Sequence, residues 1–157
     1  MEEVSLKKIR YLFFIIGFSF FALQCLGQEA EQKDIDSLLK QLSRTKEDSV
    51  KAKLYLSLMY AHSYYKAEEG LKYEQPALEL AQKLKWKEMT ANYNRIAGRL
   101  YWRIGKYDDA LKLHYEALLY FTEAKDQGSA AECLVYLGQD FANGGRYPQA
   151  LLFSKGL

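Results

Sequence analysis

The chain of 157 residues is 49% hydrophobic and 27% charged, which is the composition of a folded protein of about one domain and excludes wholesale disorder. Its 22 basic and 20 acidic residues are spread along the sequence and leave a net charge of +2, so charge indicates neither a nucleic acid nor an anionic membrane surface as partner. Only two prolines occur, whereas Ala, Leu, Lys, Glu and Gln are abundant, and these residues lose little conformational freedom in a helix. The composition therefore predicts an all-α fold.

Residues 1–27 have the pattern of a secretory signal peptide. Three basic residues precede a largely apolar, uncharged run over residues 11–23, and the small residues Cys25 and Gly27 occupy the third and first positions before an expected cut at Gln28. We therefore expect export to the periplasm or an equivalent compartment, with this segment removed.

Two alternatives remain for this segment. This run of thirteen residues is shorter than the roughly 20 that a membrane-spanning helix needs, but residues 24–27 would extend it toward an uncleaved anchor. The second alternative is lipid attachment at Cys25. Gln24 counts against it, because such signals resemble one another in having a small residue before the Cys. Cleavage would leave Cys133 as the sole thiol, for which packing between helices is the expected role and redox or nucleophilic chemistry the alternative.

Residues 28–47 are expected to be a leading helical segment. Within it, apolar side chains recur at helical spacing and predict a helix over about residues 30–43. They are Ile35, Leu38, Leu39 and Leu42.

The rest of the chain repeats itself with a period of 40 residues, and a fixed period of this size is the signature of stacked helical units. Identical or similar residues recur in one register: Gly98 and Gly138, Tyr101 and Phe141, Gly105 and Gly145, Tyr107 and Tyr147, Ala110 and Ala150, Leu111 and Leu151. In a fainter first copy, Gly70-Leu71 aligns with Ala110-Leu111, and Ala77-Leu78 aligns with Ala117-Leu118, again 40 residues apart.

These residues resemble the tetratricopeptide repeat, whose signature runs W-x2-L-G-x2-Y and then A-x3-F. The third copy has Leu134-x2-Leu137-Gly138-x2-Phe141 and Gly145-x-Tyr147-x2-Ala150, and the second has Ala97-Gly98-x2-Tyr101 and Gly105-x-Tyr107-x2-Ala110. The departures are Asn94 and Leu134 where Trp is commonest, and His114 and Ser154 where an aromatic residue is expected. The resemblance implies an α-α superhelix of helical hairpins.

Repeats are expected over residues 48–86, 87–126 and 127–157, the last one incomplete. The hairpins are predicted at 48–65 with 67–84, 87–104 with 107–124, and 128–143 with a helix from 147 onward. The period exceeds the usual one of about 34. This long-helix variant resembles the periplasmic arrays of bacterial sensor histidine kinases and related regulators.

Small residues and a proline predict details of the hairpins. Gly98 lies inside a helix, where Gly costs about 1 kcal/mol relative to Ala, so a close approach by a neighbouring helix is expected there. Gly105 and Gly145 are expected to end one helix and start the turn to the next. Pro76 should kink the second helix of the first repeat.

The resemblance also implies where a ligand lies, because the first helices of successive repeats line a groove that takes a peptide or helix. On the second repeat this face has a basic stripe beside an aromatic residue: Asn92, Arg95, Arg99, Trp102 and Arg103. The 40-residue shift adds Tyr55, Met59 and His62 on one flank, and Gln139 and Asn143 on the other. The stripe predicts an acidic or carboxylate-bearing peptide bound by the three arginines, or else an ordinary solvated face.

No apparatus for catalysis is visible in the sequence. It has no Gly-rich phosphate loop, no Ser/His/Asp order and no Cys-x-x-Cys. Neither His62 nor His114 has a second metal ligand at helical spacing, and packing is the expected role of His114. We therefore expect no enzyme activity, no metal and no cofactor.

The sequence as a whole predicts an exported module that binds a protein or peptide and no nucleic acid. The preferred context is the N-terminal sensing part of a signalling receptor, in which the chain would be a fragment and membrane association would come from an uncleaved signal or a missing C-terminal segment. The alternative is a free-standing periplasmic scaffold or assembly factor, whose open last repeat is covered by a partner or a second copy.

Overall fold

The computed structural model describes residues 32–64 and 66–146, and every regular element in these two ranges is a helix. Residues 32–44 form a helix, where the sequence predicts one over about 30–43. Six helices follow: α2 (Asp48–His62), α3 (Ala67–Leu71), α4 (Glu74–Lys83), α5 (Lys87–Arg103), α6 (Tyr107–Glu123) and α7 (Gln127–Asn143). The expected signal peptide and the predicted helix from residue 147 lie outside the described residues.

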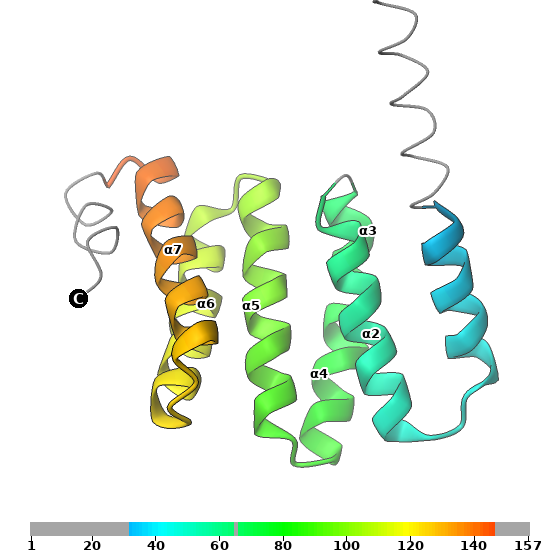
Figure 1. Cartoon of the computed structure of the whole chain (residues 1–157). Helices are drawn as coiled ribbons and strands as arrows, with labels where there is room; N and C mark the ends of the chain where they lie inside the picture. The colour runs from blue at the N-terminus through cyan, green and yellow to red at the C-terminus, as the bar shows by residue number, and fades with distance from the viewer. Residues whose placement is uncertain (1–31, 65, 147–157) are drawn as a thin grey trace, which may run out of the picture. The chain divides into compact units, whose positions relative to one another are not determined.

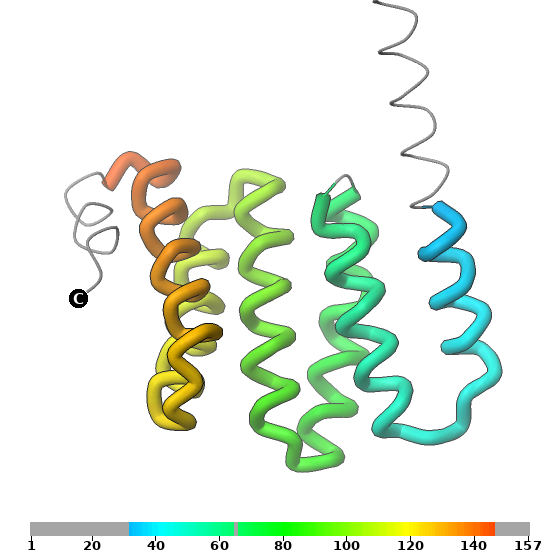
Figure 2. Tube along the Cα trace, viewed as in Figure 1, coloured from blue at the N-terminus to red at the C-terminus, as the bar shows by residue number. Residues whose placement is uncertain are grey.

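Helices α2 to α7 belong to one compact unit, residues 38–157, and pack as antiparallel hairpins in two layers. The first helices of the hairpins, α2, α5 and α7, follow one another in one layer, with α4 and α6 behind them (Figure 1). Helix α5 contacts α2 and α7 within its layer, and α6 packs against both α5 and α7. The tube in Figure 2 shows α2, α5 and α7 running in one direction and α4 and α6 in the opposite one. Among the helices in the described ranges, none combines the length and the hydrophobicity that a membrane crossing needs.

The turns between helices share one geometry at intervals of 20 residues. Gly105 and Gly145 have φ of 78° and 75°, as the predicted glycine turns require, and Lys85 and Lys125 adopt φ of 51° and 60° at the corresponding places. The next residue then donates a backbone hydrogen bond to a carbonyl five residues back, as in Lys106 N to Tyr101 O at 2.9 Å. This is the left-handed helix end that turns the chain into an antiparallel partner.

Pro76 explains why the second helix of the first repeat is divided into α3 and α4. It lies in the first turn of α4, where a missing amide donor costs nothing, and its ring would clash with the carbonyl four residues earlier in a continuous helix. Lys72 and Tyr73 at the break use tighter hydrogen bonds, from their amides to carbonyls three residues back. The predicted kink is thus confirmed and takes the form of a complete break.

Two clusters form the core between the layers. One joins α2, α4 and α5 through residues such as Met59, Ala81 and Tyr93, and the other joins α5, α6 and α7 through Phe121 and Cys133. The Tyr93 hydroxyl donates a hydrogen bond of 2.5 Å to the Ala52 carbonyl across the first cluster. These contacts fix α5 against both neighbours and so position the residues that α5 presents at the open face of its layer.

Candidate functional site

A pocket of about 290 Å³ lies where the end of α2 meets α5 and α7, and we call it the central pocket. Its lining residues come from α5, α6, α7 and the turn after α2: Tyr64, Arg99, Trp102, Arg103, His114, Tyr136, Gln139 and Asp140. Four predicted groove residues, Arg99, Trp102, Arg103 and Gln139, are among them. The packing therefore brings together side chains that the sequence places on two different repeats.

Arg99 is surrounded by tyrosine rings from both neighbouring helices. Its guanidinium carbon lies 5.4 Å from the ring centre of Tyr60, 5.1 Å from that of Tyr64 and 5.6 Å from that of Tyr136. The Tyr60 and Tyr64 hydroxyls are 3.0 Å apart, and this hydrogen bond, with a smaller contribution from the Arg99 cation, lowers the pKa of Tyr64. The rings orient Arg99 by cation–π contact without neutralising its charge.

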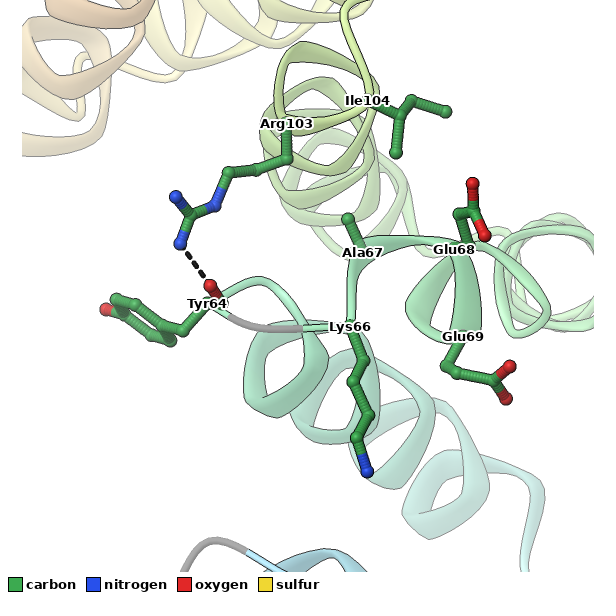
Figure 3. A pocket seen from close by; sticks show the side chains of 7 residues that line it. All are labelled: Tyr64, Lys66, Ala67, Glu68, Glu69, Arg103 and Ile104. Carbon is green, nitrogen blue, oxygen red and sulfur yellow. Dashed lines mark hydrogen bonds between the residues drawn. The ribbon is translucent and has the colours of Figure 1, made fainter. Parts of the chain in front are cut away.

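Arg103 is held at the end of α2 by backbone carbonyls. Its Nε donates a hydrogen bond of 3.0 Å to Ser63 O, and its Nη2 donates a short one to Tyr64 O. A second hollow, of about 590 Å³, opens beside this contact, and there Figure 3 shows Arg103 reaching toward Tyr64 while Glu68 and Glu69 extend away from it. Arg103 thus satisfies carbonyls that the end of α2 leaves open and keeps its positive charge.

No carboxylate of the described ranges forms an ion pair with either of these two arginines. The ion pairs found there join Lys72 to Glu69, Lys83 to Asp48, Arg95 to Glu132, His114 to Asp140 and Arg146 to Asp108. The central pocket therefore has two guanidinium groups on its wall that are not ion-paired with a described carboxylate, and Asp140, which lines the same pocket, is paired with His114.

Arg95 has a different environment from the other two arginines of the predicted stripe. It pairs with Glu132 on α7, and its Nη2 donates a hydrogen bond of 3.2 Å to Asn92 Oδ1. Only 18% of the Arg95 side chain is exposed, whereas Glu132 is 55% exposed. Arg95 and Asn92 thus form a link between α5 and α7 beside the central pocket and do not line it.

Two of the three residues predicted on the first flank, Met59 and His62, are placed differently from the prediction. Met59 is fully buried in the core and His62 is buried with its ring stacked on Tyr73, so neither forms an open groove wall. Tyr55 is half-buried, with its ring centre 6.3 Å from that of Tyr73. The reason is that α2 contacts α3, α4 and α5 and therefore buries a wider arc than a 40-residue shift from α5 implies. Tyr60 and Tyr64 occupy the open face instead.

The other flank is divided between two places. Gln139 lines the central pocket, whereas Asn143 borders a separate hollow at the turn between α5 and α6, beside residues 105–109. Asn143 Nδ2 also donates a hydrogen bond of 2.8 Å to Gln139 O, one turn back on α7. The predicted stripe is therefore interrupted at the end of α7.

His114 and Asp140 form a buried pair in the wall of the central pocket. Nδ1 of His114 lies 2.6 Å from Oδ2 of Asp140, and both side chains are 1% exposed. The other ring nitrogen, Nε2, lies 3.2 Å from the Arg95 carbonyl, and the ring stacks on Tyr136 with centres 5.0 Å apart. Burial raises the pKa of Asp140, and the hydrogen bond with His114 partly opposes this shift. The expected packing role of His114 is confirmed, and the pair adds a polar link between α6 and α7.

Asp140 was missed by sequence reasoning, although a signal for it exists. With Cys133 and Leu137 it forms one buried stripe along α7, and a carboxylate in such a stripe requires a partner. The sequence gives no indication that His114 is that partner, because 26 residues separate the two. Within the described ranges, no group of three or more His, Cys, Asp or Glu residues could hold a metal ion.

Comparison with known proteins bears on the fold. The crystal structure of the TPR domain of Arabidopsis FLU is similar, with a TM-score of 0.55 and 22% sequence identity over 80% of this chain and 92% of that one. The fold is that of a tetratricopeptide repeat domain. No family model and no curated protein matches the chain. At this identity the likeness shows the tetratricopeptide fold and not the chemistry of the site.

Proposed function

We propose that the chain is a protein-binding module, and that an acidic segment of its partner lies along the face formed by α2, α5 and α7. Arrays of this fold offer the face of their first helices to extended peptides or helices. The observation that carries the proposal is the pair of guanidinium groups, Arg99 and Arg103, in one pocket where neither is ion-paired with a described carboxylate and Asp140 is bound to His114. A partner carboxylate would supply the missing anion.

The aromatic residues around the pocket suit the same kind of ligand. Tyr60 and Tyr64 are 46% and 44% exposed on this face, and Trp102 lines the pocket with its indole Nε1 buried and unbonded to any described residue. An indole N–H can only donate, so it also requires an acceptor such as a carboxylate or carbonyl oxygen. Aromatic and arginine side chains are the residues that contribute most to binding free energy at protein interfaces.

The proposal is tested by binding of short peptides to the full chain, purified in a mild detergent. A fluorescent oligoglutamate peptide is compared with its oligoglutamine counterpart, which has the same length and no charge. We expect the double variant Arg99→Gln/Arg103→Gln to bind oligoglutamate at least about tenfold more weakly, since each charge-assisted hydrogen bond contributes about 1.5–3 kcal/mol.

The matched control removes a cation from the other layer. Lys112 is exposed on α6, away from the central pocket, so Lys112→Gln should leave the affinity unchanged. Circular dichroism of each variant verifies that the helices are intact. Equal binding of oligoglutamate and oligoglutamine, or equal loss in both variants, would show that the arginines are ordinary solvated surface.

For the wider context we propose export by the segment over residues 1–27 and a role as the sensing part of a signalling receptor. The basic residues and apolar run of this segment support export, and the long-helix repeat supports the receptor context by resemblance alone. A free-standing periplasmic scaffold remains the second candidate. Fusion of residues 1–27 to a reporter enzyme that is active only after export tests the first point, and the coding sequence downstream of Leu157 separates the two contexts.

A further inference from the structure

The hydrogen bonds of the His114–Asp140 pair show how many hydrogens the pair holds. The Arg95 carbonyl can only accept a hydrogen bond, so Nε2 of His114 must carry a hydrogen to bond with it at 3.2 Å. The 2.6 Å contact between Nδ1 and Asp140 Oδ2 requires a second hydrogen between them. Whether that hydrogen belongs to an imidazolium beside a carboxylate or to a carboxylic acid beside a neutral imidazole, the pair has no net charge.

Loss of the shared proton changes both the charge and the hydrogen bonding of this wall. The pair then has a net charge of −1, and the single remaining N–H of His114 can satisfy Asp140 or the Arg95 carbonyl but not both. Asp140 Oδ1 is already buried without a partner among the described residues. A bare carboxylate at this place is therefore poorly compensated from within the protein.

The charged and titratable groups around the pair come from every neighbouring element. The same pocket is lined by Arg99 and Arg103 of α5 and by Tyr64 after α2. Tyr136 of α7 stacks on His114 and also lies beside the Arg99 guanidinium. Arg146, after α7, acts on Asp140 through its positive charge. A ligand carboxylate at Arg99 thus shares the pocket with Asp140, separated from His114 by one aromatic ring.

We propose that the central pocket binds an acidic segment together with a proton, because the segment is accepted when the His114–Asp140 pair keeps its shared proton and repelled when the pair releases it. This inference rests on the function proposed above and adds a pH dependence to it. With the proton present, the pocket has two uncompensated positive charges, and without it one of them is offset by Asp140. Affinity for an acidic ligand is therefore highest at low pH and falls as the pH rises through the point at which the pair releases its proton.

The test measures the affinity of the full chain for the oligoglutamate peptide from about pH 5.5 to about pH 8.5, the range in which a histidine is most commonly the group that titrates. The glutamates of the peptide stay ionised throughout, since their pKa is about 4.3. We expect affinity to fall roughly tenfold across the range, a typical size for coupling between two sites. Calorimetry in buffers of different ionisation enthalpy should show proton uptake on binding near the midpoint.

Two variants assign the effect to the pair. The double variant Asp140→Asn/His114→Gln contains neither member of the pair, so its affinity should not change across the range. His62→Gln should keep the pH dependence of the parent, because His62 is buried against Tyr73 and does not line the central pocket. Proton uptake in the unsubstituted chain keeps the test decisive if the double variant does not fold.

The outcomes separate the two proposals. An affinity for oligoglutamate that depends on Arg99 and Arg103 but not on pH, with no proton uptake, overturns the coupling and leaves the proposed function intact. A pH dependence that persists in Asp140→Asn/His114→Gln overturns it as well. If oligoglutamate does not bind at any pH, the proposed function fails and the coupling fails with it.

Discussion

Gly98 on α5 and the ring of His114 on α6 are in direct contact, and a Cβ built at Gly98 would lie 2.5 Å from Nε2 of His114. The ring cannot give way, because Asp140 and the Arg95 carbonyl hold both of its nitrogens. The close approach expected from a glycine inside a helix is thus confirmed, and its partner is a buried histidine.

We predict that Gly98→Ala destabilises the fold even though Ala is the better helix former. The clash in a well-packed interface costs about 1–3 kcal/mol, against a gain of about 1 kcal/mol in helix propensity, so a net loss of about 1–2 kcal/mol is expected. Urea unfolding followed by circular dichroism measures it. Gly128→Ala is the control, because its nearest neighbour would be Asp126 Oδ1 at 3.6 Å, and this change should be neutral or slightly stabilising. Equal effects of the two changes would contradict the contact.

The four left-handed turn residues give a second prediction with opposite signs. Lys85 and Lys125 adopt positive φ, which a residue with a Cβ does at a cost of roughly 1–2 kcal/mol, whereas glycine adopts it freely. Lys125→Gly should therefore stabilise the fold by about 0.5–1 kcal/mol after the extra chain entropy of glycine is subtracted. Gly105→Ala, at φ of 78° with open space around its Cβ, should destabilise it by about 1 kcal/mol through backbone conformation alone. Unfolding midpoints that move the same way in both variants would exclude this explanation.

The helices were predictable from the sequence because the signals for them are local. Gly105 and Gly145 mark the turns, Pro76 marks the break, and α5, α6 and α7 begin and end within one residue of the predicted bounds. Lys85 and Lys125 fall between predicted helices, but their positive φ was not predicted, since lysine has no preference for it. Their left-handed conformation is imposed by the antiparallel packing of the helices on either side.

The candidate site was only partly predictable, because its geometry depends on contacts between repeats. Arg99, Trp102, Arg103 and Gln139 were found by helical spacing, and they do meet in the central pocket. The pairing of Arg95 with Glu132 joins residues 37 apart, and helical spacing on one helix does not reveal it. Met59 was misplaced for a related reason. Helix α2 is buried against three helices, and periodicity alone does not show how many helices contact it.

Tyr93 offers a prediction about the polar contact inside the core. Its hydroxyl donates a hydrogen bond to the Ala52 carbonyl of α2, and burial raises its pKa because the phenolate would be desolvated. Tyr93→Phe keeps the ring and loses this bond, so we expect a loss of about 1 kcal/mol in unfolding free energy. The control is Tyr115→Phe, because Tyr115 is 52% exposed on α6 and should change stability by no more than about 0.5 kcal/mol. A neutral Tyr93→Phe would show that the bond between α2 and α5 contributes nothing.

Cys133 gives a prediction about reactivity that separates packing from chemistry. Burial raises the pKa of its thiol to about 11, with the positive charge of Arg95 opposing the shift in part. Below that pH the thiol stays protonated, and at pH 8 only roughly one part in a thousand is the reactive thiolate. In a Cys25→Ser background, which removes the other thiol, alkylation of Cys133 by iodoacetamide at pH 8 should be at least about a hundredfold slower in the folded chain than in urea. The folded-state rate should rise with pH and with denaturant, since either ionisation or opening of the α6–α7 interface exposes the thiolate. Rapid alkylation of the folded chain at neutral pH would instead assign Cys133 a nucleophilic or redox role.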